Sequence, residues 1–370
     1  MNLIELHIIQ SFPVTCLNRD DLGSPKNAIF GGVQRARVSS QCWKRAIREA
    51  AHEAKPEIFN SVRSRLVGPK AVEAAKSLGA SENISNACGK IVCAILGKDD
   101  KADGMVKTLL YFSPKSIQNL VKGIIESGNL SDDVALSILN DTSKKCDVLS
   151  KFVKEKISAN VLRNLGDSVD DAADIALFGR MVADDATQTV EGAAMFSHAL
   201  STHSVRNDLD FFSAVDDVKI GAEDAGAGHI GTTEFNSACY YRYIGINLNL
   251  LKQSNLFNQE ELNVVLENFI RACVIANPTA RRNAMFGYTL PTCVLALRRN
   301  GQPLSLANAF ETPISAGKNG FAAESEKAML NEWESLKATF GLSEEVKSVV
   351  KKDGDTLEAM IAKMLENIAR

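Results

Sequence analysis

Six cationic side chains occur close together near the N-terminus of a chain that is acidic overall. The 370 residues include 42 lysines and arginines against 45 aspartates and glutamates, which gives a formal charge of −3. Between Leu22 and Arg48 there is no aspartate or glutamate, and the cations there are Lys26, Arg35, Arg37, Lys44, Arg45 and Arg48. Such a cluster can neutralise the phosphates of a nucleic acid. The alternative is a solvated surface whose cations pair with acids from elsewhere, and the charges alone do not separate the two.

The second half of this segment predicts an amphipathic helix. In "SSQCWKRAIREAAHEA", Ser39 or Ser40 is a good N-cap, and Trp43, Ala46, Ile47, Ala50 and Ala51 form an apolar stripe. Lys44 and Arg48 are four residues apart, so they share a face and repel each other unless an anion lies between them. The free N–H groups and the positive dipole of the helix N-terminus favour an anion at the same end.

Two more cations and a glycine pair precede this helix. Arg35 and Arg37 are two residues apart, so an extended chain places both on one face. The sequence "FGG" at 30–32 lets the backbone turn tightly or approach a ligand closely. No Walker A motif occurs, and no G-x-G-x-x-G opens a helix, so we expect no nucleotide cofactor.

The amino-acid composition limits the classes of protein to which the chain can belong. A hydrophobic content of 45% supports a folded core. The N-terminal "MNLIELHIIQ" lacks a basic region and is typical of a strand, so we expect neither a signal peptide nor a membrane span, and a cytoplasmic location. The eight cysteines are then expected to be reduced, and none forms a C-x-x-C pair, so no metal site is predicted.

The order of predicted elements indicates an α+β fold. Strands are predicted at "LIELHIIQ", "ADIALFGRM", "AAMFSHALSTH", "YYRYIGINLNLL" and "TCVLALRR", and helices at "EELNVVLENFIRACVIAN" and in the C-terminal region. From Glu57 to about Leu165 the pattern is helical without strands, which indicates a helical insertion. These elements describe a small sheet with one covered face.

One long segment fits neither pattern. "HSVRNDLDFFSAVDDVKIGAEDAGAGHIGTTEF" is too long for an ordinary connection and contains Phe211 and Phe212 between charged neighbours. We predict a projecting arm, and exposed aromatic rings on such an arm need a partner, either a base or a protein.

Several ordered blocks together resemble one known family. "LNRDD…NAIFGGVQRARVSSQ…KRAIR", "DIALFGRM", "AMFSHALSTH", "DFFSAVDD", "HIGTTEFNSACYYRYIGINL" and "PLSLANAFE" are similar to the backbone subunit of type I-E Cascade, the CRISPR RNA surveillance complex (the CasC or Cse4 family). The blocks keep their order up to about Glu311. The helical insertion and the C-terminal tail add little to the resemblance.

The resemblance implies a right-hand architecture. It comprises an RRM-like (ferredoxin-like) palm, a large helical fingers insertion and a β-hairpin thumb. The expected boundaries are palm 1–58, fingers 59–165, palm 166–202, thumb arm 203–235, and palm 236–370 with the C-terminal helices.

The resemblance also assigns RNA-contacting residues by matching position. Phosphate and ribose contacts fall on Arg19, Lys26, Ser39, Gln41, Lys44 and Arg48, and Arg45 joins them as part of the cationic segment. Met181 and Phe212 are expected to wedge against bases beside a displaced nucleotide. Phe211 stands where relatives often have tryptophan, so it keeps the apolar bulk and lacks the indole N–H donor.

The implied partners are CRISPR RNA, the target DNA strand through the guide, further copies of the chain, and the other Cascade subunits (large, small, 5′-handle-binding and 3′-hairpin-processing). No enzyme activity is expected. Two alternatives remain: a metal-dependent ribonuclease, because carboxylate pairs such as Asp20-Asp21 can hold Mg²⁺, and a protein-only scaffold whose cations dock acidic partners.

Overall fold

The computed structural model describes most of the chain, and it divides into two compact units. The described residues are 1–96, 104–141, 147–157, 172–180, 189–214, 229–253 and 257–368. The first unit, here called the sheet unit, comprises Met1–Ala50, Ala194–Asn249 and Leu266–Arg370. The second, the helical unit, comprises Ala51–Ala193 and Leu250–Val265.

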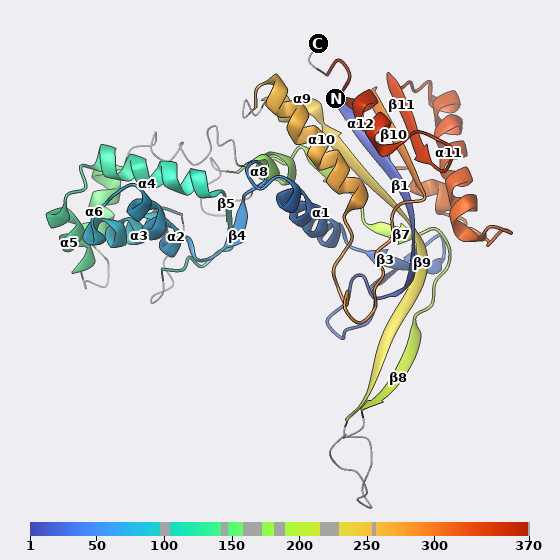
Figure 1. Ribbon diagram of the computed structural model, residues 1–370, viewed down its shortest axis with the longest axis horizontal. Coiled ribbons are helices and arrows are strands. Elements are labelled where there is room, and N and C mark those ends of the chain that lie inside the picture. Colours follow the sequence, from blue (N-terminus) through green and yellow to red (C-terminus); the bar gives the residue numbers. More distant parts are fainter. Residues whose placement is uncertain are drawn as a thin grey trace, which may run out of the picture. The chain divides into compact units, whose positions relative to one another are not determined.

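The sheet unit is built on an antiparallel sheet with β1 and β9 at its centre (Figure 1). The strands in spatial order are β11 (Val346–Lys351), β10 (Cys293–Asn300), β1 (Asn2–Thr15), β9 (His229–Asn247), β7 (Ala199–Ser201), β3 (Val33–Val38) and β2 (Asn27–Phe30). Two further strands, β6 (Ala194–Phe196) and β8 (Asp208–Ala214), also pair with β9. The α+β class is therefore confirmed, and β2, β3 and β11 are strands that the sequence pattern did not predict.

Both faces of this sheet are covered, so the predicted single covered face is wrong. Tyr241 and Tyr243 of β9 pack in one core with Trp333 of α11 (Gly320–Phe340) and η2 (Ala307–Phe310). Arg242 points to the opposite face, because successive side chains of a strand alternate. There its guanidinium lies 4.0 Å from the ring centroid of Trp43 in α1 (Ser40–Ala54), and it donates to the Cys273 carbonyl of α10 (Gln259–Ile275) at 2.8 Å. The final helix is α12 (Leu357–Leu365).

A buried charge network joins β1, β9 and β10 beneath α11. The Glu5 carboxylate accepts from the Tyr243 hydroxyl at 2.7 Å and from the Leu304 N–H at 2.9 Å, and it forms an ion pair with Arg299. The neighbouring His7 Nδ1 lies 3.0 Å from the Tyr241 hydroxyl. Burial, with the Arg299 charge as a smaller cause, lowers the pKa of His7 to about 3, so this imidazole is neutral at pH 7.

The helical unit has a core of its own. Its helices are α2 (Val67–Ser77), α3 (Glu82–Leu96), α4 (Pro114–Gly128), α5 (Asp132–Leu139), α6 (Asp147–Lys156), α8 (Ala173–Phe178) and α9 (Leu248–Gln253). Buried apolar residues of α2 to α6 form one cluster, as the predicted helical insertion requires. A short strand pair, β4 (Val62–Ser64) and β5 (Leu110–Phe112), also occurs there, so the expectation of no strands is wrong.

Two other predicted strands differ from the structure. "ADIALF" forms the helix α8, in which the first five residues are all buried. A short apolar run buried on every side gives no periodicity that separates a strand from a helix. The strand at "YYRYIGINLNLL" ends at Asn247, whose side-chain oxygen accepts from the Asn249 N–H at 3.1 Å and opens α9.

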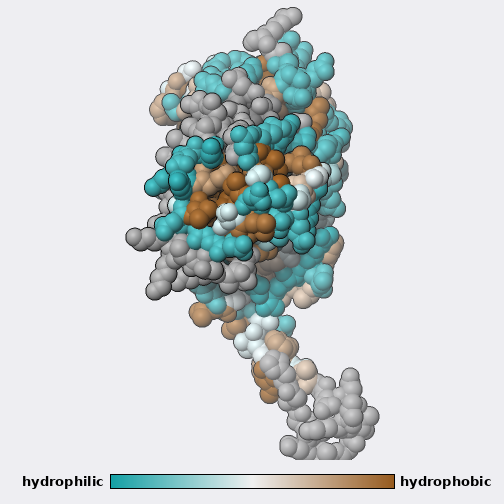
Figure 2. Space-filling model, turned by 90° about the vertical axis from the view of Figure 1, so that its left-hand side faces the viewer, coloured by the Kyte–Doolittle hydropathy of each residue, from teal (hydrophilic) through white to brown (hydrophobic). Residues whose placement is uncertain are grey.

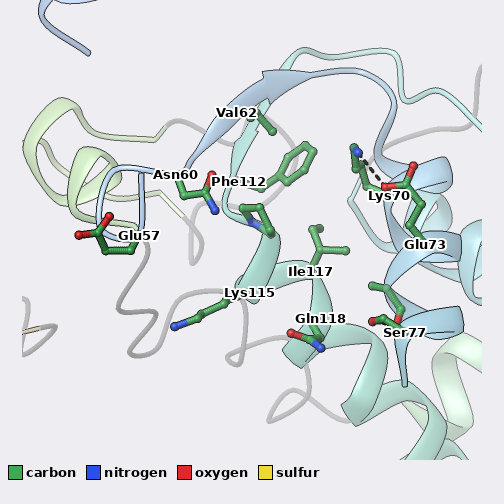
Figure 3. A pocket seen from close by; sticks show the side chains of 12 residues that line it. Glu57, Asn60, Val62, Lys70, Glu73, Ser77, Phe112, Lys115, Ile117 and Gln118 are labelled. Atoms are coloured by element: carbon green, nitrogen blue, oxygen red, sulfur yellow. Dashed lines mark hydrogen bonds and ion pairs between the residues drawn. The ribbon is translucent and has the colours of Figure 1, made fainter. Parts of the chain in front are cut away.

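One face of the helical unit carries apolar residues ringed by hydrophilic ones, as Figure 2 shows. Exposed apolar side chains of this unit include Leu136 of α5 and Val148 of α6. A cavity of about 530 Å³ lies between α2, α4 and the β4–β5 pair (Figure 3). Phe112 and Ile117 line it, and Lys70 and Glu73 at its edge form an ion pair of 2.7 Å. Because its lining carries both charge signs, this cavity does not have the character of a phosphate site.

Candidate nucleic-acid interface

Helix α1 begins with the predicted cap. The Ser39 hydroxyl accepts a hydrogen bond from the Cys42 N–H at 3.3 Å, so Ser39 is the N-cap. Trp43, Ile47 and Ala51 are buried, which confirms the apolar stripe. The stripe fixes the helix against the sheet and leaves Gln41, Lys44, Arg45 and Arg48 on its other sides.

The cations of α1 have different surroundings. The Lys44 ammonium lies 5.3 Å from the ring centroid of Phe196 in β6. Arg48, one turn further on, is half-buried. Arg45 is exposed, and its Nε lies 2.7 Å from Glu49, the first acid after the segment; the hydrogen bond to this carboxylate raises the pKa of Arg45. An exposed pair of this kind contributes little free energy, so a phosphate can compete for Arg45.

Arg35 belongs to the fold and not to a cationic surface. It is fully buried, and its guanidinium donates to the carbonyls of Ser201 at 3.1 Å and Phe310 at 2.8 Å. The expectation that Arg35 and Arg37 share an accessible face is therefore wrong. Gly31 explains the close approach, because it has a φ of +59° and an added Cβ would collide with the Glu311 carbonyl oxygen. The "FGG" turn therefore packs against the backbone of this same chain at Glu311, and not against a ligand.

The remaining cations converge on the N-terminus of α1. The His198 Nδ1 accepts from the Ser40 N–H at 3.2 Å, which satisfies one of the backbone donors at the start of the helix. Burial, then the charges of Arg37 and Lys26, lower the pKa of His198. Burial raises the pKa of the Cys42 thiol to about 11. The charges of Lys26 and Arg45 oppose this increase, so Lys26 also lies within electrostatic range of α1. We call Lys26, Arg37, Lys44, Arg45 and Arg48 the cationic face.

Arg19 lies in an exposed loop before this face. The neighbouring Asp20 carboxylate accepts from the N–H groups of Leu22 and Ser24, both at 2.9 Å, and so stabilises the local turn. Within the described ranges Arg19 has no salt bridge, so it is available to an anion.

The predicted arm contains an exposed two-stranded hairpin. All seven residues of β8 are exposed, and β8 pairs with the N-terminal half of β9, which extends away from the sheet (Figure 1). Phe211 is 66% exposed and Phe212 is 41% exposed. Adjacent residues face opposite sides, so Phe211 shares a face with Leu209, whereas the Phe212 ring lies over Gly231. Residues 215–228 and Met181 lie outside the described residues.

The carboxylate pairs do not assemble into a metal site in the part of the chain that the structure describes. No group of three or more His, Cys, Asp or Glu side chains suitable for a metal ion occurs there. Asp20 caps its own turn, and Asp132 accepts from the Ser81 hydroxyl at 2.5 Å. The pairs at 99–100, 170–171, 184–185 and 216–217 lie outside the described residues.

None of the described helices has the length and apolarity that a bilayer crossing requires.

A cationic helix end beside a hairpin with exposed aromatic rings is typical of proteins that bind a nucleic-acid backbone. The chain belongs to the family of CT1975-like proteins, whose model matches residues 4–369. A search of curated proteins found no match.

Two solved structures are similar over nearly the whole chain. A chain of a "CRISPR RNA-guided surveillance complex, pre-nicking" is 27% identical, with a TM-score of 0.82 over 97% of this chain and 99% of that one. A chain of a "CRISPR RNA-guided surveillance complex" is 23% identical, with a TM-score of 0.71 over 99% of each chain, and it supports the fold alone. The predicted relationship to CRISPR surveillance-complex subunits is thereby confirmed.

Proposed function

We propose that the chain is the RNA-binding backbone subunit of a type I-E Cascade complex. The observation that carries this proposal is the fold match over 97% of the chain to a chain of an RNA-guided surveillance complex. The cationic face gives the match a physical basis, because Lys26, Arg37 and Arg45 gather where the free N–H groups of α1 already favour anions.

The sheet unit corresponds to the palm in this proposal. Following the chain, β1, α1, β7, β9, α10 and β10 give a βαββαβ order, and the sheet orders these strands as β10-β1-β9-β7. This connectivity supports an RRM-like (ferredoxin-like) palm. The β8–β9 hairpin corresponds to the thumb. The fingers correspond to the helical unit, so we place their boundaries at 51 and 193 in place of 59 and 165.

The proposed mechanism is largely independent of RNA sequence. Arg19, Lys26, Gln41, Lys44, Arg45 and Arg48 contact phosphates and riboses, so much of the binding free energy comes from counterion release. Ser39 contributes by capping α1, since its hydroxyl already accepts from Cys42. Both sheet faces are covered by helices, so bases do not stack on the sheet; instead Phe212, with Met181 and Phe211, interrupts stacking.

Copies of the chain assemble head to tail along the guide in this proposal, and the bases left between wedges pair with target DNA. The large, small, 5′-handle-binding and 3′-hairpin-processing subunits complete the complex. The chain itself performs no catalysis, uses no cofactor, and acts in the cytoplasm. The alternatives make distinct predictions: a ribonuclease would cleave RNA annealed to the guide when Mg²⁺ is added, and a protein-only scaffold would purify with the absorbance ratio of pure protein.

A salt titration tests RNA binding at the cationic face. Binding to a CRISPR repeat–spacer RNA and to a scrambled RNA is compared for the wild type and a Lys44→Ala/Arg48→Ala variant. Each phosphate contact on a single strand contributes about 0.7 to the log–log slope, so the variant should flatten the slope by about 1.4 for both RNAs.

The matched control is Lys318→Ala/Lys327→Ala. It removes two exposed cations, one of them on α11 across the sheet from α1, and should leave the slope unchanged. An equal change in both variants would mean that net charge, and not the cationic face, determines binding. No RNA binding by the wild type would contradict the proposed function.

A further inference from the structure

A second stretch of the chain lacks acids. Between Glu267 and Glu311 there is no aspartate or glutamate, and the arginines there are Arg271, Arg281, Arg282, Arg298 and Arg299. Three of the five pair with acids from elsewhere: Arg271 with Glu358, Arg298 with Glu345, and Arg299 with Glu5. Across the ranges that the structure describes, Arg281 and Arg282 have no such pair.

These two arginines lie on the α10–β10 loop, residues 276–292, which is held firmly at its neck. The Gln10 side chain donates to the Thr289 carbonyl at 2.8 Å and to the Asn277 side-chain oxygen at 2.9 Å. The Asn277 amide also donates to the Thr289 carbonyl at 2.8 Å. Gly287 packs so closely that an added Cβ would lie 2.9 Å from the Thr15 hydroxyl. The sheet therefore holds the loop in a defined conformation.

The outer part of this loop exposes cations beside aromatic rings. Phe286 is 68% exposed and Tyr288 is 47% exposed, and the Tyr288 hydroxyl donates to the Ile275 carbonyl at 3.2 Å, which fixes its ring. Arg282 is exposed. Arg281 has a φ of +51°, unusual for a side chain with a Cβ, and its Nε–H is buried without an acceptor.

The loop lies at the end of the sheet from which the hairpin extends (Figure 1). The pKa of the Cys16 thiol shows which charges lie around it. Burial and the charges of Asp20 and Glu234 raise this pKa, whereas the charges of Arg281 and Arg19 lower it. Arg281, Arg19 and Glu234, the last of these in β9 near the base of the hairpin, therefore all lie within electrostatic range of Cys16.

From this geometry we infer that the α10–β10 loop is a second RNA contact, which extends the path from Arg19 toward the hairpin. Arg281 and Arg282 contact phosphates, and the faces of Phe286 and Tyr288 contact bases or riboses. The inference rests on the proposed function and adds residues to it. Arg281 and Arg282 form no salt bridge in the described ranges, and such cations favour RNA over an apolar protein partner, which would require a neutral surface.

The test is a salt titration of an Arg281→Gln/Arg282→Gln variant with the same repeat–spacer RNA. The slope should flatten by about 1.4, so the loss of affinity between about 50 and 200 mM salt should be about sevenfold smaller than for the wild type. The Arg282→Gln single variant, at an exposed position that folding does not need, should flatten it by about 0.7. The Lys318→Ala/Lys327→Ala variant again serves as the control.

A second readout is photo-crosslinking to RNA that contains 4-thiouridine, with the expected crosslink on the peptide that carries Phe286 and Tyr288. Unchanged slopes in both arginine variants and no crosslink on this peptide would overturn the inference. If the Lys44→Ala/Arg48→Ala slope flattens in the same experiment, the proposed function survives that failure. Lost self-association with an unchanged RNA slope would assign the loop to a second copy of the chain, and would also overturn the inference.

Discussion

A Phe211→Ser/Phe212→Ser variant is expected to bind RNA between about 30-fold and about 10⁴-fold more weakly than the wild type. Stacking of a base on an aromatic side chain contributes about 1–3 kcal/mol, so two rings together contribute about 2–6 kcal/mol. The rings are exposed on opposite faces of the hairpin, so nothing in the sheet unit compensates for their loss. Fluorescence anisotropy of labelled RNA at fixed salt measures the change.

The slope with salt separates this effect from that of the cationic face. Stacking releases no counterions, so the double variant should lower affinity at every salt concentration without changing the slope. The matched control is Leu209→Ser/Ile230→Ser, which removes exposed apolar groups from the same hairpin and leaves both rings. An equal loss in this control would assign the effect to hairpin packing, and no loss in the aromatic variant would show that the rings do not contact RNA.

A Glu5→Leu variant is expected to lower the free energy of unfolding of the sheet unit by about 3–5 kcal/mol. Removal of one member of a buried ion pair leaves the other charge buried without compensation, here Arg299. The Tyr243 hydroxyl and the Leu304 N–H lose their acceptor at the same time. Urea unfolding followed by tryptophan fluorescence reports on this unit, because Trp43 and Trp333 both belong to it.

The matched variant for this prediction is Glu5→Leu/Arg299→Met. Replacement of both members by apolar residues of similar volume removes the uncompensated charge, so the part of the lost stability that this charge causes should return. The Tyr243 hydroxyl and the Leu304 N–H still lack their acceptor in the double variant. If the double variant is as unstable as Glu5→Leu alone, the cost comes from lost packing and from the two lost hydrogen bonds, and not from the buried charge.

Local patterns predicted the elements whose hydrophobic periodicity is unambiguous. β1, α1, α10, β10 and the C-terminal helices all occur, and Ser39 caps α1 as its position before the stripe predicted. The errors have physical causes. Five of the six residues of α8 are buried, so its sequence shows neither the helical nor the strand period. The second cover of the sheet depends on α11, which packs on β9 from more than 70 residues away.

At the candidate site, too, contacts between near neighbours in sequence were predictable and contacts between distant residues were not. The pairing of Arg45 with Glu49 could have been predicted, because the two are four residues apart on a helix. The burial of Arg35 could not, since its acceptors lie on Ser201 and Phe310, which are distant in sequence. His198 was missed for a similar reason: a lone histidine in a strand region gives no sign that it will accept from the first turn of α1.

Copies of the chain are expected to assemble along RNA by binding its backbone without regard to its sequence. Native mass spectrometry of the purified chain with RNAs of increasing length tests it most directly. The number of bound copies should rise in even steps with RNA length, and equally for repeat–spacer and scrambled RNAs. A single bound copy at every length, or none, would contradict it.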